Sequence, residues 1–147
     1  MKNRIYKGAK RWCMPALFLM LGMVVFRLIL FIGYVPTESM EPTLQAGSYI
    51  LGTRFISNLE TGDIIVFHHE GQLLVKRIAA SEGDQIDLSE LTYMVTVPIP
   101  VWEKPVLTIP ENAFFVLGDN TQNSIDSRYW EDKFVMRNDI VAKLFIK

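Results

Sequence analysis

The sequence has little of the side-chain chemistry that many small enzymes use. It contains one cysteine and two histidines among 147 residues. A single cysteine excludes an intramolecular disulfide framework and a zinc site built from several cysteines. The histidines, His68 and His69, are adjacent and face opposite ways if a strand runs through them. This placement argues against a Ser-His-Asp triad and, without a third ligand at helical or hairpin spacing, against a metal site. We interpret both as residues at the end of a sheet.

Acidic residues are absent from the first 35 positions, which carry six basic residues. The remaining 112 residues hold nine basic and 16 acidic residues, a net charge of −7. Because nucleic-acid binding needs a concentrated basic surface, this acidic body argues against nucleic acid as the main partner. The length allows one modest domain with its own core and leaves little room for a second.

The most apolar stretch, residues 13–35, contains 23 residues and a single charge, Arg27. About 20 apolar residues in a helix cross a bilayer core. Arg27 costs on the order of 3 kcal/mol in the membrane, less than the apolar residues contribute, and its long side chain can reach the outer interface. Five positive charges in the first eleven residues favour a cytoplasmic N-terminus. We therefore predict a basic cytoplasmic segment (1–12), a transmembrane anchor (13–35) and an extracytoplasmic domain (36–147).

A cleaved signal peptide and a buried core helix are the two alternatives to an uncleaved anchor. A signal peptide has a shorter apolar region, about 7 to 15 residues, followed by an Ala-x-Ala-like cleavage site. Here the corresponding residues are Gly33-Tyr34-Val35-Pro36, a poor substitute for such a site. A buried core helix usually keeps some polar positions on one face. The missing cleavage site favours the anchor.

The body after Pro36 consists of short apolar runs separated by turn residues. Glu70-Gly71 predicts a tight turn between two strands. Three prolines in residues 98–105 indicate a loop or a sheet edge. The fold class is therefore mostly β, a compact curved sheet or barrel-like domain behind one transmembrane helix. The predicted strands are residues 49–55, 64–68, 72–80, 85–88, 91–97, 106–109, 113–117 and 140–146.

A serine and a lysine stand out in this body. Ser39 lies in a loop stiffened by Pro36 and Pro42, although a lone loop serine is usually a turn former. Lys76 shares a strand face with apolar neighbours. Desolvation there would lower the lysine pKa, as a lysine general base requires. The alternative is an edge-strand lysine that discourages aggregation.

A polar segment, residues 117–130, follows an apolar strand. Gly118, Asp119 and Asn120 are strong turn residues. Asp126 and Arg128 lie two apart, so in an extended segment they project on one face and can pair. The alternative is a surface loop closed by an exposed ion pair worth only about 0–1 kcal/mol.

Four motifs in order behind a membrane anchor resemble the type I signal peptidase (leader peptidase) family of membrane-anchored Ser–Lys peptidases. Ser-Met-x-Pro-Thr-Leu matches residues 39–44, and Gly-Asp-Ile-x-Val-Phe matches residues 62–67. Lys-Arg-Ile with a downstream Gly-Asp matches residues 76–84, and Gly-Asp-Asn-x-x-Asn-Ser-x-Asp-Ser-Arg matches residues 118–128. The resemblance covers the anchor and nearly all of the body.

The resemblance implies a role for each matched residue. Ser39 is expected to attack the scissile carbonyl, with Lys76 as the free amine that accepts its proton. Ser124 would orient that lysine, and the Ser39 N–H with the Thr37 hydroxyl would stabilise the oxyanion. A salt-bridge cluster that holds the Ser124 loop near the lysine would comprise Asp126, Arg128 and also Arg77.

The implied substrates are secretory preproteins with small residues at positions −1 and −3. Such a peptide would add as an extended strand between residues 35–39 and 74–76. The candidate walls of its pocket are Val35, Pro36, Met40, Leu44, Leu74 and Val75, of which Leu44 and Val75 are nearly as well explained as core. No cofactor or metal is implied, and the expected partners are preproteins and the lipid bilayer, with the protein a monomer.

Some features depart from the family pattern. Glu131-Asp132-Lys133 follows Trp130, where the family usually has a glycine. Only 41 residues separate Lys76 from Gly118, which excludes the large second β-domain of some Gram-negative members. Alternatives are a pilus-assembly factor that binds without cutting, and a Ser–Lys peptidase with a single client. Because relatives of the first kind lose the serine or the lysine, we favour an active signal peptidase.

Overall fold

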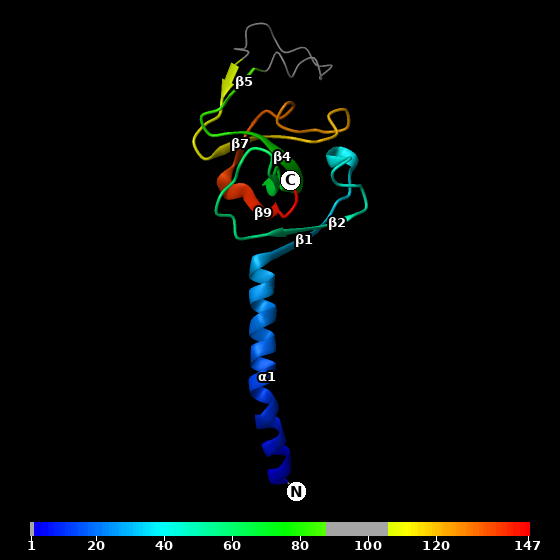
Figure 1. Ribbon diagram of the computed structural model, residues 1–147, viewed down its shortest axis with the longest axis vertical. Coiled ribbons are helices and arrows are strands. Elements are labelled where there is room, and N and C mark those ends of the chain that lie inside the picture. The colour runs from blue at the N-terminus through cyan, green and yellow to red at the C-terminus, as the bar shows by residue number, and fades with distance from the viewer. Residues whose placement is uncertain (1, 88–105) are drawn as a thin grey trace.

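The computed structural model describes residues 2–87 and 106–147, which form one long helix followed by a domain made mostly of strands (Figure 1). Besides the helix α1 (Lys2–Ile29), these described residues form two 3-10 turns, Glu38–Met40 and Arg137–Asp139. This is the predicted mostly β fold behind one N-terminal apolar helix. The strands are β1 (Leu30–Tyr34), β2 (Tyr49–Thr53), β3 (Ile64–His69), β4 (Gln72–Ser81), β5 (Gln85–Asp87), β6 (Val106–Thr108), β7 (Ala113–Leu117), β8 (Val135–Met136) and β9 (Ile140–Leu144).

The helix α1 contains an apolar stretch, Trp12–Ile29, that is long enough to cross a membrane. None of this stretch is buried, and the helix extends from the domain as a stalk (Figure 1). It ends at Ile29, whereas the sequence predicted an anchor that continues to residue 35. The next residues pair with β2, and Phe31 is buried while Ile32 is exposed. That alternation is the pattern of a strand, so the sheet of the domain begins where the helix stops.

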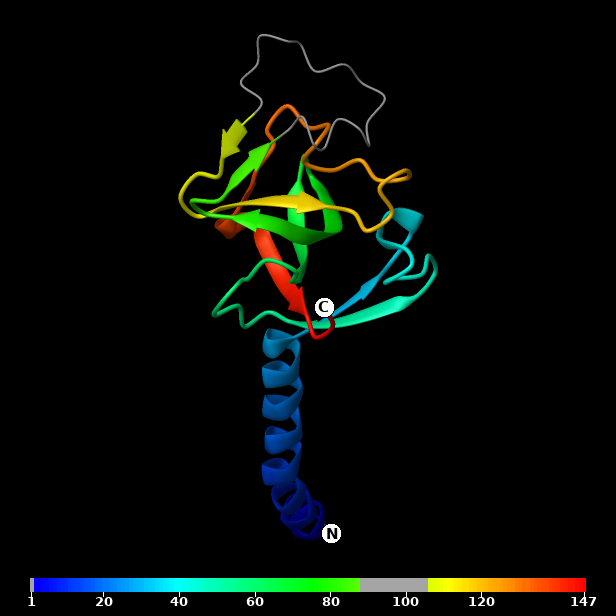
Figure 2. The same ribbon diagram turned by 45° about the horizontal axis from the view of Figure 1, so that its top comes forward.

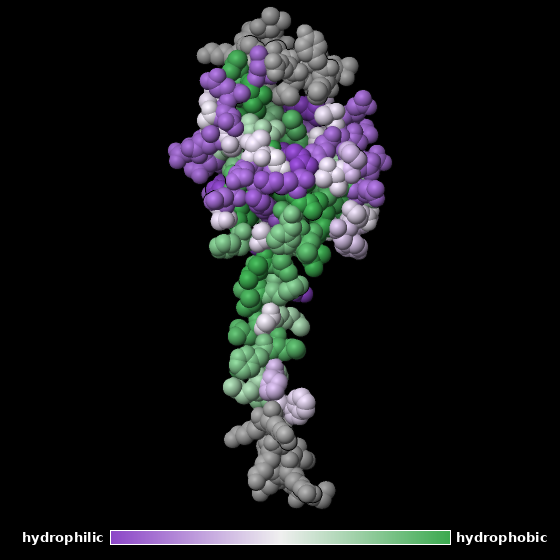
Figure 3. Space-filling model, viewed as in Figure 1, coloured by the Kyte–Doolittle hydropathy of each residue, from purple (hydrophilic) through white to green (hydrophobic). Residues whose placement is uncertain are grey.

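Apolar surface continues from α1 onto the part of the domain next to it (Figure 3). On β1 and β2, the outward-facing side chains of Ile32, Tyr34 and Leu51 are exposed. The Tyr34 and Tyr49 rings meet edge to face with centroids 5.6 Å apart. The β1–β2 pair therefore buries one face against the core and leaves an apolar face outside.

Seven described strands form one antiparallel sheet in the order β1-β2-β9-β3-β4-β7-β8, and β5 pairs separately with β6. Figure 2 shows the strands turning around a common centre instead of lying in one plane. The β3–β4 hairpin closes over Glu70 and Gly71, which have φ values of 48° and 77°. Two positive φ values are typical of a type I′ turn. The predicted hairpin is confirmed.

The strand β3 is buried on both faces and positions both halves of the domain. Ile64 and Val66 pack into one apolar cluster, which also contains Met40. Ile65 and Phe67 pack into a second cluster, against which Trp130 packs. The first cluster therefore supports the turn that carries Ser39, and the second supports the loop that ends at Trp130.

Most of the predicted strands are present with small differences at their ends. β2 ends at Thr53 and β9 at Leu144, each two residues before the predicted end. The sequence did not predict β1, which lies within the apolar run, or the two-residue β8. The predicted strand 91–97 and the proline-containing segment 98–105 lie outside the described residues.

Candidate active site

A cleft of about 500 Å³ lies between two segments of the chain. One wall comes from β1 and the residues after it up to Ser39, and the other from the first half of β4 up to Lys76. Of the described strands, only β2 pairs with β1, and β4 pairs with β7 only from Arg77 onward. Each wall therefore keeps one strand edge that no other described strand pairs with, so the cleft can accept an extended chain.

Ser39 lies on the 3-10 turn that follows β1. The Glu41 N–H closes this turn by donating to the Glu38 carbonyl at 3.0 Å. Met40 is 1% exposed and anchors the turn in the core. Ser39 is half-buried and lines the cleft, and its hydroxyl oxygen is 3.3 Å from that of Thr37. The two hydroxyl groups therefore face the same part of the cleft.

Lys76 lies on β4 opposite Ile65 and lines the same cleft. It is only 3% exposed. Burial lowers the pKa of its amine; the Asp126 carboxylate opposes this shift, and the Arg128 guanidinium adds to it. The free amine is therefore favoured more than in an exposed lysine. Because the side chain is buried, it is not the solvated edge lysine of the alternative interpretation.

Ser124 and Asp126 form a buried hydrogen-bonded pair. The Ser124 hydroxyl donates to Asp126 Oδ2 at 2.7 Å, and the Gly118 N–H donates to the same oxygen at 2.9 Å. The sequence-based expectation was that Ser124 orients Lys76. Among the described residues, no hydrogen bond joins Lys76 to Ser124 or to Ser39. Catalytic hydrogen bonds are often long in unliganded sites and shorten when substrate binds.

The predicted pairing of Asp126 with Arg128 is present, and it is buried. Arg128 Nε donates to Asp126 Oδ1 at 2.8 Å and Nη2 donates to Oδ2 at 2.8 Å, with the two side chains 2% and 0% exposed. Burial raises the pKa of Asp126, but hydrogen bonds from Arg128, Gly118 and Ser124 lower it further, so the net pKa is below its ordinary value. The exposed-pair alternative is wrong, and the carboxylate stays charged.

Arg77 does not join this cluster, in contrast to the prediction. Its Nε and Nη2 donate to the two carboxylate oxygens of Asp119 at 2.8 and 2.7 Å, and its Nη1 donates to the Gly62 carbonyl at 2.7 Å. Successive residues of a strand point to opposite faces, so Arg77 projects away from the face of Lys76 and Asp126. The sequence assigned Asp119 only a turn role and missed this pair.

Gly118 is a further residue that sequence reasoning missed. A Cβ at this position would lie against Ser124 Oγ and 2.5 Å from both Ser124 Cβ and the Ser39 carbonyl oxygen. Only a glycine therefore permits this close approach. Gly118 comes directly after β7, and the loop that begins there carries Ser124. The missing side chain at Gly118 therefore lets Ser124 lie against the turn that carries Ser39.

The predicted pocket walls are mostly in the cleft. Leu44 is the exception, because it is 4% exposed and packs in the core with Phe31 and Ile50. At Leu44 the core alternative is the correct one. The five predicted residues that line the cleft are Val35, Pro36, Met40, Leu74 and Val75.

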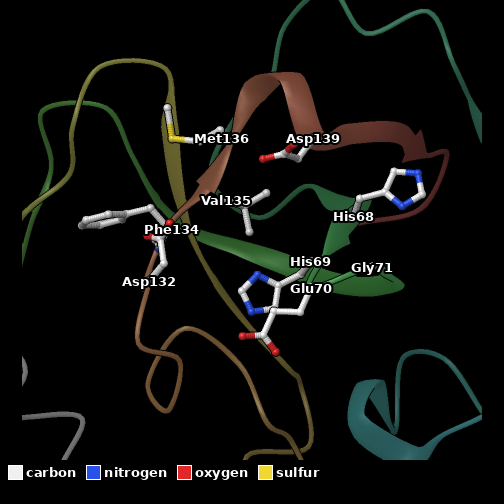
Figure 4. Close-up of a pocket in the computed structure, with 9 residues that line it drawn as sticks. All are labelled: His68, His69, Glu70, Gly71, Asp132, Phe134, Val135, Met136 and Asp139. Atoms are coloured by element: carbon white, nitrogen blue, oxygen red, sulfur yellow. Dashed lines mark hydrogen bonds between the residues drawn. The ribbon is translucent and has the colours of Figure 1, made fainter.

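The two histidines lie at the end of β3, as predicted, beside a smaller pocket of about 270 Å³. Figure 4 shows that their rings point in different directions. His69 stacks on Trp130 with ring centroids 3.9 Å apart, while His68 is exposed. No group of three His, Cys, Asp or Glu among the described residues could hold a metal ion. We assign His69 a packing role.

Comparisons with known proteins agree with this geometry. The family model "Signal peptidase, peptidase S26" matches residues 9–97 and 92–147. A probable signal peptidase I-2 from Synechocystis is 31% identical in an alignment of 134 residues, with 78% of this chain and 61% of that protein covered. The signal peptidase I of Bacillus amyloliquefaciens is 31% identical, with 87% of this chain and 84% of that protein covered. The chain thus spans less than two thirds of the cyanobacterial relative and most of the Bacillus one. It belongs to the signal peptidase family, peptidase S26.

Proposed function

We propose that this chain is a membrane-anchored serine endopeptidase that removes N-terminal signal peptides from secreted preproteins. In this proposal Ser39 is the nucleophile, Lys76 is the general base, and the cut follows small residues at −1 and −3. The observation that carries it is that Ser39 and a buried lysine line one cleft in a chain of this family.

The reaction needs only the side chains already present in the cleft. Ser39 Oγ forms a bond to the scissile carbonyl carbon while Lys76 Nζ accepts the hydroxyl proton. The carbonyl oxygen becomes an oxyanion that accepts hydrogen bonds from the Ser39 N–H and the Thr37 hydroxyl. The C–N bond then breaks, Lys76 returns the proton to the leaving amine, and an acyl ester remains on Ser39.

Hydrolysis of the ester repeats these steps with water. Lys76 accepts a proton from the water molecule as its oxygen attacks the ester carbonyl. The new tetrahedral intermediate collapses, the bond to Ser39 Oγ breaks, and the lysine returns the proton to that oxygen. The products are a new carboxylate on the signal peptide and the original state of both residues.

The buried contacts around Ser124 support its role in holding the lysine. Its only proton is committed to Asp126, so the hydroxyl oxygen offers lone pairs to a neighbouring donor. An ammonium or amine N–H of Lys76 is such a donor. In the proposed mechanism, Ser124 accepts this hydrogen bond and thereby directs the lysine lone pair toward Ser39.

A preprotein in this proposal binds as an added strand. The two unpaired strand edges at the cleft provide backbone donors and acceptors for an extended peptide. Apolar residues such as Val35 and Leu74 leave room for small side chains beside the reacting carbonyl. The same apolar walls keep water from Lys76 once the peptide is bound.

The proposed location is the cytoplasmic membrane, with one transmembrane pass. Trp12–Ile29 supplies the apolar length, and the basic residues before it favour a cytoplasmic N-terminus. The domain would then lie on the extracytoplasmic face, where signal peptides emerge. The apolar face of β1 and β2 adjoins the helix and would lie close to the lipid.

The test is cleavage of a membrane-targeted preprotein with an Ala-x-Ala site by the detergent-purified chain. Wild type, Ser39→Ala and Lys76→Ala are compared, with Ser57→Ala as an exposed control, and mass spectrometry locates the cut. We expect cleavage after the small residue by wild type and the control only. Near-wild-type activity in Ser39→Ala or Lys76→Ala would refute the mechanism. No cut by folded wild type would refute a general signal peptidase.

A further inference from the structure

Asn120 joins the loop after β7 to the turn that carries the proposed nucleophile. Its backbone N–H donates to the Ser39 carbonyl at 3.1 Å, and its side-chain Nδ2 donates to the Glu38 carbonyl at 3.1 Å. The Asn123 N–H in turn donates to the Asn120 carbonyl at 3.1 Å. One residue therefore holds two consecutive carbonyl groups of the Ser39 turn and is itself fixed by its own loop.

The bond to Glu38 has a consequence for Ser39. The Glu38 carbonyl and the Ser39 N–H belong to the same peptide group, which is planar and trans, so the two point in opposite directions. A donor that fixes the direction of this carbonyl also fixes the direction of the N–H. The Glu38 carbonyl also accepts from the Glu41 N–H at 3.0 Å. Both of its lone pairs are therefore in use, and the peptide plane has little freedom to rotate.

Asn120 provides the side-chain hydrogen bond that holds the peptide group between Glu38 and Ser39. The residue before the turn, Thr37, makes no side-chain hydrogen bond that caps it. Within the described part of the chain, Asn120 Nδ2 supplies the side-chain donor to this peptide group. A hydrogen bond to the carbonyl also polarises the peptide group and makes its N–H a stronger donor.

We propose that Asn120 is a positioning residue that aligns and polarises the Ser39 N–H as an oxyanion donor before substrate binds. This inference rests on the proposed function, because the N–H meets an oxyanion only if Ser39 attacks a carbonyl carbon. The loop that carries Asn120 also carries Ser124. The same loop thus acts on the nucleophile through Asn120 and on the lysine through Ser124.

The test uses the full chain with Asn120→Ala and Asn120→Asp. Both variants keep the backbone N–H and lose the side-chain donor, and aspartate keeps the shape while it repels the Glu38 carbonyl. Asn138→Asp is the control, since it makes the same change at an exposed asparagine. We measure kcat and KM on the Ala-x-Ala preprotein, and the pH dependence of kcat for Asn120→Ala.

Removing a whole oxyanion donor costs about 10²–10³ in kcat, so a misaligned donor is expected to cost roughly tenfold or more. We expect this loss in kcat for both variants, with KM and the pH midpoint of Asn120→Ala unchanged. A raised KM with unchanged kcat would overturn the proposal in favour of substrate binding. A shifted midpoint would overturn it in favour of an effect on Lys76.

The possible results distinguish failure of the Asn120 proposal from failure of the proposed peptidase function. Cleavage by wild type and by both Asn120 variants at equal rates would overturn the inference and leave the proposed function intact. No cleavage by wild type would overturn the proposed function and the inference with it. If Asn120→Ala fails to fold, Asn120→Asp decides the question by its ratio of kcat to that of Asn138→Asp.

Discussion

Gly118→Ala tests whether the close approach of Ser124 to the Ser39 turn is needed for activity. The added Cβ would meet Ser124 Oγ and lie 2.5 Å from Ser124 Cβ and the Ser39 carbonyl oxygen. Real Cβ contacts are essentially never shorter than 3.0 Å. The Ser39 oxygen is a backbone atom and cannot rotate away. The backbone of one or both serines must therefore shift.

The expected size of the effect follows from that shift. Overpacking a core typically costs about 1–3 kcal/mol, and a misplacement of about 1 Å in an active site can cost roughly 100-fold in rate. We therefore expect Gly118→Ala to lower kcat/KM about 100-fold and the free energy of unfolding by about 1–3 kcal/mol. Most Gly118→Ala molecules would remain folded, so the loss in rate would come from the displaced serines and not from unfolding.

The assay is kcat/KM on the Ala-x-Ala preprotein together with denaturant unfolding of the same preparation. Gly22→Ala is the matched control, because it adds the same methyl group at a position with nothing within 4 Å. The control should keep the wild-type kcat/KM. A folded Gly118→Ala protein with more than a third of the wild-type kcat/KM would refute the reasoning, as would a rate loss that equals the fraction unfolded.

Four further predictions concern the charged and polar groups. Cleavage should rise with pH through the Lys76 pKa, with a midpoint below that of an ordinary lysine because burial lowers this pKa; a flat rate between about pH 6 and 10, with chemistry rate-limiting, would contradict the base assignment. The free energy of unfolding should also rise with pH between the lowered pKa of folded Lys76 and the ordinary lysine pKa, because in that range the lysine is protonated only in the unfolded chain. Lys76→Met should abolish this rise in unfolding curves measured over a series of pH values. Ser124→Ala should lower kcat more than the free energy of unfolding, whereas equal losses would indicate a purely structural role. Asp126→Asn leaves Arg128 buried without a carboxylate and should cost about 3–5 kcal/mol in urea unfolding; a loss below about 1 kcal/mol would show that the pair is not buried in solution.

The burial of Lys76 could be predicted because a strand has a period of two. Its neighbours at positions 74 and 78 are apolar, so the pattern alone placed the lysine on a buried face. The β3–β4 turn was equally readable, since Glu70-Gly71 stands between two apolar runs. Local patterns of this kind depend only on residues close in sequence.

The end of the helix could not be read in the same way. The residues of β1 are about as apolar as the Trp12–Ile29 stretch of α1, so hydropathy does not separate a helix from a buried strand. The pairing of Arg77 with Asp119 joins residues 42 positions apart. Such a pair depends on the register between β4 and β7, which no local spacing reveals.

The contacts of Asn120 and Leu44 also could not be predicted from local sequence patterns. Asn120 reaches Glu38 across 82 positions, and within its own segment it is only a turn residue. Leu44 follows the proposed nucleophile, Ser39, closely in sequence, but its side chain packs in the core. Proximity in sequence to Ser39 therefore does not place a side chain in the cleft.

The junction between α1 and β1 has no intervening residue, since Ile29 ends the helix and Leu30 begins the strand. The Arg54 N–H also donates to the Ile29 carbonyl at 2.7 Å, which ties the helix end to the residue after β2. The domain thus lacks a flexible tether at this point. Under the proposed function, the cleft would sit at one height above the bilayer. A preprotein would be cut efficiently only if the distance from its own apolar segment to its cleavage site matches that height, so substrate selection would include a length criterion as well as the small residues.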